Sequence, residues 1–240
     1  MSNLTEIKKA MPRVTEESSP SSVTKQRQSK PSLTEQAYSQ IEEAIVTLKL
    51  APGTAVSEQM LSDMTGIGRT PIREAIQRLA REHLIFILPQ RGLLIPHVDT
   101  RKQLKLLKTR REVERLICRS AAHSATIEER AGFARVAETF LAASKADDGL
   151  RFMRADREFN ELSLIAARNE FAEGAMRLMQ GLSRRFWYIH YKQTADLPEI
   201  ARLHAAIAQA IADGEEQAAA DCLDRLIDNI EEFTHATLLS

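Results

Sequence analysis

The residues best suited to bind a nucleic acid lie between positions 66 and 79. Arg69, Arg73 and Gln77 are four residues apart, so on a helix they share one face, with the Thr70 hydroxyl beside them. Guanidinium groups one turn apart suit phosphate oxygens and guanine edges. The apolar residues recur at the spacing of the opposite face: Ile72, Ala75, Ile76 and Leu79. The pattern predicts a helix with one side for DNA and one side for a core.

A second group of polar residues lies on apolar helix faces in the C-terminal half. Its members are Arg110, Asp156, Asn160 and His204. Ionisable groups that face a core are costly unless they are paired or bind a ligand. Three interpretations stay open: a satisfied buried network, a polar-lined cavity for a small molecule, or a metal site. Nearby, a cationic and aromatic cluster contains Arg185, a possible second anion contact, and Tyr188.

The elements that must position the first group read as a winged helix-turn-helix over residues 32–98. Helical spacing runs from Leu33 to a stop at Pro52-Gly53, and Ser57 suits the N-cap of a second helix. The third helix follows a turn at 65–68. Two apolar runs, 84–88 and 93–95, then predict a β-hairpin. Its tip, Arg91-Gly92, is either a wing that probes a groove or a structural cap.

The remainder, residues 99–240, is helical throughout, so we predict a mainly α protein. Helices are expected near 100–123, 127–144, 147–167, 169–192, 196–213 and 215–238. About six helices joined by short loops predict an antiparallel bundle. Residues 1–31 are rich in Ser, Thr, Lys and Pro and are expected to be a disordered tail, whose basic residues either contact DNA or are simply solvated.

Composition narrows the class of protein. Lys+Arg and Asp+Glu each total 33 among 240 residues, so the net charge is zero and any DNA contact must come from a local patch. Cys118 and Cys222 fit neither a disulfide framework nor a paired metal motif. No signal peptide and no apolar run of about 20 residues is present, so we expect a cytoplasmic protein without a membrane partner.

The winged segment resembles the GntR family of bacterial transcription regulators, in its FadR branch with a C-terminal FCD domain. The resemblance rests on Pro52-Gly53, Glu58 to Leu61, Gly66 to Leu79 and Arg91-Gly92. It implies a homodimer in which a small metabolite, bound in the helical domain, alters DNA binding. By position, Arg69, Thr70 and Arg73 look like base and phosphate contacts, and Arg91 and Gly92 look like a wing tip in the minor groove.

Two positions of the winged segment depart from the family pattern. Gly68 stands where the family usually has Ser or Thr, which removes a hydroxyl from the helix cap. Gln59 stands where some members carry a DNA-contacting Arg, and it is kept here as a candidate DNA contact.

In the helical domain, Arg110 looks like the family's ligand-carboxylate residue, so the resemblance implies a carboxylate effector. Many members hold a divalent metal with an Asp, a His four residues later and two further His. This chain has Asp156 and His204, but Asn160 and Leu226 at the other two positions. Leu offers no donor atom, so no metal cofactor is expected. Cys222, one turn before Leu226, either substitutes or simply packs.

The expected function is a DNA-binding transcription regulator that responds to a ligand and is not an enzyme. Two copies of the third helix would enter successive major grooves of an inverted repeat. The effector would contact Arg110, Asp156, Asn160, His204, Arg185 and Tyr188. One alternative is an α-helical hydrolase using Asp156 and His204, although no nucleophile motif accompanies them. Another is a helical adaptor for proteins only, which would leave the arginine face unexplained.

Overall fold

The computed structural model describes residues 31–194 and 196–238. The predicted tail at 1–31 therefore lies outside the described residues, except for Pro31. The described residues from Ser32 onward belong to one compact unit. Among the described helices, none combines the length and the apolar character that crossing a membrane requires.

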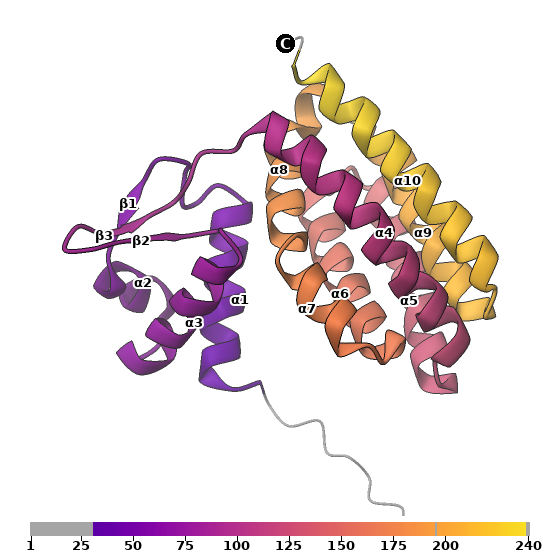
Figure 1. Ribbon diagram of the computed structural model, residues 1–240, viewed down its shortest axis with the longest axis horizontal. Coiled ribbons are helices and arrows are strands. Elements are labelled where there is room, and N and C mark those ends of the chain that lie inside the picture. The colour runs from indigo at the N-terminus through magenta and orange to yellow at the C-terminus, as the bar shows by residue number, and fades with distance from the viewer. Residues whose placement is uncertain (1–30, 195, 239–240) are drawn as a thin grey trace, which may run out of the picture. The chain divides into compact units, whose positions relative to one another are not determined.

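Three helices and a small sheet make up the winged part (Figure 1). The helices are α1 (Leu33–Val46), α2 (Glu58–Thr65) and α3 (Arg69–Arg81). The Ser57 hydroxyl accepts a hydrogen bond from the backbone N–H of Met60 and so caps α2. The predicted apolar stripe of α3 is buried against α1 and α2, which confirms the core side of that helix.

The sheet has three strands, one more than the sequence predicts. β1 (Ala55–Val56), β2 (Phe86–Leu88) and β3 (Gly92–Leu94) are antiparallel in the order β1-β3-β2. A two-residue strand is too short to show an alternating pattern, so β1 went unpredicted. The first strand of the hairpin also starts later than predicted, at Phe86, and Leu84 and Ile85 before it are fully buried in the core of the winged part.

Seven helices form the described C-terminal bundle: α4 (Thr100–Ser124), α5 (Ile127–Lys145), α6 (Gly149–Ala167), α7 (Glu170–Arg177), α8 (Gln180–Thr194), α9 (Leu197–Asp213) and α10 (Glu216–Ala236). In Figure 1, α10 runs beside α4, and the two helices are in contact. The core lies between them and α5, α6 and α9, where Phe133 and Phe140 each pack edge to face on Phe159.

The single helix predicted over 169–192 is wrong, because the chain turns at Leu178 and Met179 and begins a new helix. The two pieces have different neighbours: α7 packs on α4, whereas α8 packs on α1 and α4. A straight helix could not serve both, and neither Gly nor Pro marks the break. The other five predicted helices of the bundle agree with the structure to within about three residues.

Candidate DNA-binding surface and ligand pocket

The polar face of α3 is exposed. Arg69, Thr70, Arg73 and Gln77 all lie at the surface, while the four apolar residues of the helix are at most 3% exposed. The sequence-predicted division of α3 into two sides is therefore what the structure has. The wing turn at Arg91 and Gly92 is exposed as well.

Both arginines of this face are held by α2. Arg69 donates to the Oε1 atom of Gln59 at 2.9 Å, and Arg73 Nε donates to Glu58 Oε2 at 2.7 Å. The Arg73–Glu58 pair is exposed, with 64% and 39% of the two side chains accessible, so it is screened by water. Any phosphate that binds Arg73 must compete with Glu58. Gln59, a candidate DNA contact, thus lies beside the arginines.

The wing tip depends on a glycine. Gly92 has a φ of +87°, and a Cβ there would lie 3.2 Å from the carbonyl oxygen of Val56. Both facts favour glycine at the point where β3 begins and passes β1. The neighbouring Arg91 side chain is exposed at the turn.

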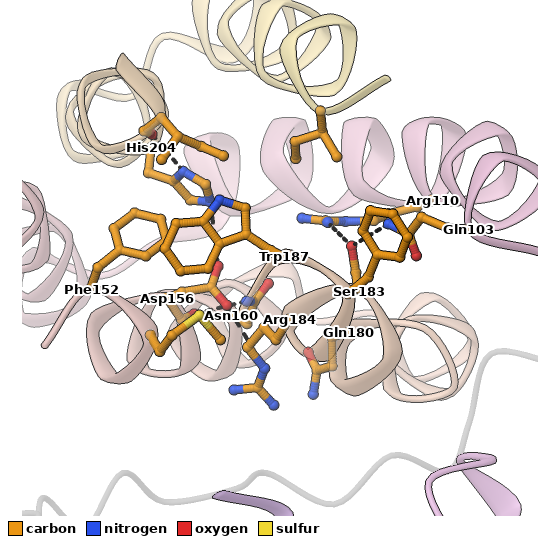
Figure 2. Close-up of a pocket in the computed structure, with 14 residues that line it drawn as sticks. Gln103, Arg110, Phe152, Asp156, Asn160, Gln180, Ser183, Arg184, Trp187 and His204 are labelled. Atoms are coloured by element: carbon orange, nitrogen blue, oxygen red, sulfur yellow. Dashed lines mark hydrogen bonds and ion pairs between the residues drawn. The ribbon is translucent and has the colours of Figure 1, made fainter. Parts of the chain in front are cut away.

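A small, partly open pocket lies within the helical bundle (Figure 2). Four of the six predicted effector residues line it: Arg110, Asp156, Asn160 and His204. The space open to the centre of a water molecule is about 30 Å³, enough for one or two waters. A metabolite would therefore have to displace side chains in order to enter. These four polar residues, which the sequence places on apolar helix faces, lie on α4, α6 and α9.

Arg110 is buried and largely occupied by its own helix. Its Nε and NH2 groups donate to the two carboxylate oxygens of Glu114, at 2.6 and 3.0 Å. Its NH1 group donates to the Ser183 hydroxyl at 2.7 Å. A guanidinium has five N–H groups, so two remain without a partner among the described residues. Burial lowers the pKa of Arg110, but Glu114 outweighs that effect and the pKa is raised.

Asp156 is the centre of a second polar cluster. Its Oδ1 lies 3.3 Å from His204 Nε2, and its Oδ2 lies 3.8 Å from Arg184 Nε. Burial alone would raise the pKa of Asp156, but His204, Arg184 and Arg110 together hold it below its ordinary value. The carboxylate is consequently ionised at neutral pH. Its Oδ2 is buried and has no hydrogen-bond partner among the described residues.

The ring of His204 is oriented by polar contacts of both its nitrogens and by its aromatic neighbours. Nδ1 lies 2.8 Å from the carbonyl oxygen of Ile200, which can only accept, so Nδ1 carries hydrogen. Nε2 faces the Asp156 carboxylate, so both contacts are satisfied together when the ring is cationic. Phe140 and Phe152 pack against the ring with centroid distances of 5.0 and 5.2 Å.

The residues present do not fit a zinc-type metal. Asn160 turns its amide N–H toward the backbone oxygen of Asp156, and Leu226 is buried among apolar side chains. No cluster of three or more His, Cys, Asp or Glu suited to an ion occurs within the described ranges. Positive charge in the pocket comes instead from Arg110 and Arg184.

Two predicted effector residues lie elsewhere. Arg185 is 1% exposed and donates to the Pro96 carbonyl oxygen at 2.8 Å, outside the pocket lining. Burial lowers its pKa to about 10, and no carboxylate of the described part lies within ion-pair distance. Tyr188 is half-buried and packs beside Tyr191. Arg185 was predicted as a second anion contact and Tyr188 as part of the cationic and aromatic cluster, but neither lines the pocket.

Several lining residues escaped the sequence argument. They are Gln103, Gln180, Ser183, Arg184 and Trp187. Arg184 and Trp187 belong to the cationic and aromatic cluster of α8, which was noticeable because aromatic residues are scarce (5%). Gln103 and Ser183 gave no signal, since neutral polar side chains are common at helix surfaces. That Ser183 faces the pocket can be inferred only once the start of α8 at Gln180 is known.

Comparison with known families accounts for most of the described chain. The pattern described as bacterial regulatory proteins of the gntR family matches residues 33–95, and the FCD domain pattern matches residues 105–229. The first covers the three helices and the sheet of the winged part. The second covers more than half of the chain and contains most of the pocket.

Individual relatives agree with both matches. The helix-turn-helix-type transcriptional repressor RspR of Escherichia coli K12 is 25% identical over 209 residues, covering 83% of this chain and 89% of the repressor. A helix-turn-helix-type regulator of Streptomyces ambofaciens is 40% identical over 62 residues, only 26% of either chain. The solved structure of E. coli McbR/YncC has a TM-score of 0.71 at 19% identity, covering 87% of this chain and all of that one, so the fold is shared.

Proposed function

Because the chain belongs to the GntR family of bacterial regulatory proteins and carries an FCD domain, we propose that it is a homodimeric, cytoplasmic regulator of a metabolic operon. A small metabolite in the pocket of the FCD domain sets its affinity for DNA. The observation that carries this proposal is an exposed arginine face on α3 together with a polar pocket in the bundle.

DNA binding is assigned to α3 and the wing. Arg69 and Arg73 are one turn apart on an exposed face, where each can reach a phosphate or a guanine edge. Two copies of α3, one from each protomer, would read an inverted repeat. Thr70, Gln77, Gln59, Arg91 and Gly92 complete the proposed surface.

The effector is proposed to be a small carboxylate that also carries a hydroxyl group. Two N–H groups of Arg110 remain for a carboxylate after Glu114 and Ser183 are satisfied. Asp156 Oδ2 needs a donor, and the indole N–H of Trp187 needs an acceptor. A hydroxyl group can donate to the first or accept from the second. A metal ion is not part of this proposal.

Regulation requires that the effector bind one arrangement of the protein better than another. The pocket has room for only one or two waters, so a bound metabolite must shift the side chains that line it. The state without effector and the state with effector therefore differ in the bundle.

The DNA half of the proposal is tested by selection from random duplexes. Purified full-length protein should enrich an inverted repeat, because a symmetric dimer presents two copies of α3. Recovery of a pool no different from the starting library would contradict sequence-specific binding. Recovery of a single unrepeated site would contradict the dimer.

The effector half is tested by a thermal-shift screen of hydroxylated and plain carboxylates. We expect hydroxylated members to raise the melting temperature most. Binding should then be lost in Arg110→Ala/Glu114→Ala, which removes both charges and leaves no buried carboxylate unpaired. Arg111→Ala is the matched control, because Arg111 lies on the same helix but pairs with Asp228 at the surface. Unchanged binding by the double variant, or no carboxylate that binds, would refute this half.

A further inference from the structure

We propose that Arg184 couples the pocket to α1 of the winged part, through Glu42 on one side and Asp156 on the other. This inference rests on the proposed function of the pocket as a ligand site, and it names the residue through which occupancy reaches the DNA-binding elements. The guanidinium of Arg184 is shared by the two carboxylates. A change that moves it toward Asp156 weakens its ion pair with Glu42 of α1.

The contacts of Arg184 span both parts of the chain. Its NH2 group donates to Oε1 of Glu42 on α1, while its Nε lies 3.8 Å from Oδ2 of Asp156 in the pocket. All three side chains are at most 7% exposed, so water does not screen these charges as it would at the surface. Figure 2 shows Arg184 extending past Asp156, with a dashed line between them.

The pocket end of this link is incomplete. Arg184 Nε and Asp156 Oδ2 are both buried without a hydrogen-bond partner among the described residues, and 3.8 Å is too long for a bond between them. A ligand hydroxyl placed there could accept from Nε and donate to Oδ2. The link is therefore open at the place where a ligand would bind.

Other residues of α8 contact either the pocket or the winged part. Gln180, Ser183, Arg184 and Trp187 follow helical spacing along one face and line the pocket. Between them, Gly181 lies against Leu84 of the winged part, where a Cβ would come within 2.8 Å of Cδ1, and Leu182 packs on the winged core. Arg184 alone among the lining residues of α8 also pairs with a carboxylate of α1, within the part that the structure describes.

A second ion pair, at the residue next to Glu42, provides a matched control. Arg154 donates to Glu43, the neighbour of Glu42 on α1, at 2.9 Å. This pair also joins the bundle to α1, but it is more exposed (62% and 34%), and neither of its members lines the pocket with Asp156. Loss of the Arg154–Glu43 pair should weaken the contact with α1 without affecting communication with the pocket.

The first test reads communication from the pocket to α1. Hydrogen–deuterium exchange is measured on the full chain for peptides of α1, relative to α10 as a report of global opening. Asp156→Asn should slow exchange in α1, about fivefold, because Arg184 then rests more fully on Glu42. The effect should vanish in Arg184→Met and persist in Arg154→Met. An equal effect in both backgrounds, or none in the unaltered chain, would overturn the proposal.

The second test reads the reverse direction, which linkage requires. Trp187 is the chain's one tryptophan and lines the pocket, so its emission reports its surroundings there. Glu42→Gln should shift the emission maximum of Trp187, because the released guanidinium turns toward Asp156, whereas Glu43→Gln should not. Identical spectra for the two variants would contradict the coupling. Neither test uses an effector or DNA, so their failure is separate from failure of the proposed function.

Discussion

At the scale of single residues, each site contains an arginine that is paired with a carboxylate of the protein. Arg110 is matched by Glu114, Arg184 by Glu42, and Arg73 by Glu58. The buried pairs compensate for the cost of removing charge from water, whereas the exposed pair adds little stability. In the proposed DNA-binding surface, the exposed pair instead holds the arginine for which a phosphate must compete.

Removing the internal competitor of Arg73 should strengthen DNA binding. Glu58→Gln keeps the size of the side chain but removes the negative charge beside Arg73. Because an exposed ion pair contributes up to about 1 kcal/mol, affinity for a selected duplex should rise by roughly two- to fivefold. Fluorescence anisotropy at fixed salt measures this. Glu74→Gln is the control, since Glu74 is bonded to Thr34 rather than to an arginine of the face. Equal or weaker binding by Glu58→Gln would count against the competition.

Asp156 should make the protein sensitive to acid. Its folded pKa lies below the ordinary value of 3.8, so its contribution to stability is complete above that value and is lost as the pH falls through the lowered pKa. Between about pH 5 and about pH 3, the free energy of unfolding should fall more in the unaltered chain than in Asp156→Asn. Urea unfolding at both pH values gives the comparison. Parallel losses in the two proteins would exclude this role.

Residue patterns predicted part of the pocket and missed the rest for a physical reason. Arg110, Asp156 and His204 stand out because a charged side chain on an apolar stripe needs a partner. Ser183 does not, because a hydroxyl is tolerated almost anywhere on a helix. The link from Arg184 to Glu42 joins residues 142 positions apart and depends on tertiary packing, which no local spacing reports.

At the scale of elements, the N-terminus of α3 has two residue types that are unusual at their positions. Gly68 is the N-cap and provides no side-chain hydrogen bond, and Pro71 occupies the third helical position, where it lacks the N–H that a cap usually binds. A hydroxyl at position 68 would therefore find only the N–H of Thr70. The loss of the family's Ser or Thr costs less here than it would at the start of another helix.

The cap of α3 can be tested by adding the missing hydroxyl. Gly68→Ser should raise the free energy of unfolding by only a few tenths of a kcal/mol, since a Cβ there meets nothing within 4 Å and one N–H is available. Ser57→Ala should cost about 1 kcal/mol, because that cap bonds Met60. Urea unfolding compares them. A gain of more than about 1 kcal/mol from Gly68→Ser would show that a second donor exists.

Helical periodicity predicted most elements but neither β1 nor the division between α7 and α8. Strong stripes of apolar residues, as in α3, report which face is buried whatever the neighbours are. A two-residue strand has no period, and the turn at Leu178 arises because successive segments pack on different helices. Both features are decided by tertiary contacts.

At the scale of the whole molecule, zero net charge means that attraction to DNA is local. In the function proposed here, the exposed cations of α3 and the wing provide it, and acidic residues elsewhere balance them. Affinity should therefore depend on salt through a few phosphate contacts rather than through the total charge. It follows that a single arginine of this face should matter more than several lysines elsewhere.

The most direct test of the account is a titration of a selected inverted-repeat duplex with the unaltered chain and with Arg73→Ala at one salt concentration. Loss of a guanidinium that contacts a base or a phosphate should weaken binding by about tenfold or more, while urea unfolding stays unchanged because Arg73 is exposed. Arg81→Ala, at the far end of the same helix, should bind almost as the unaltered chain does. Equal affinity of Arg73→Ala and the unaltered chain would contradict the assignment of α3 as the element that reads DNA.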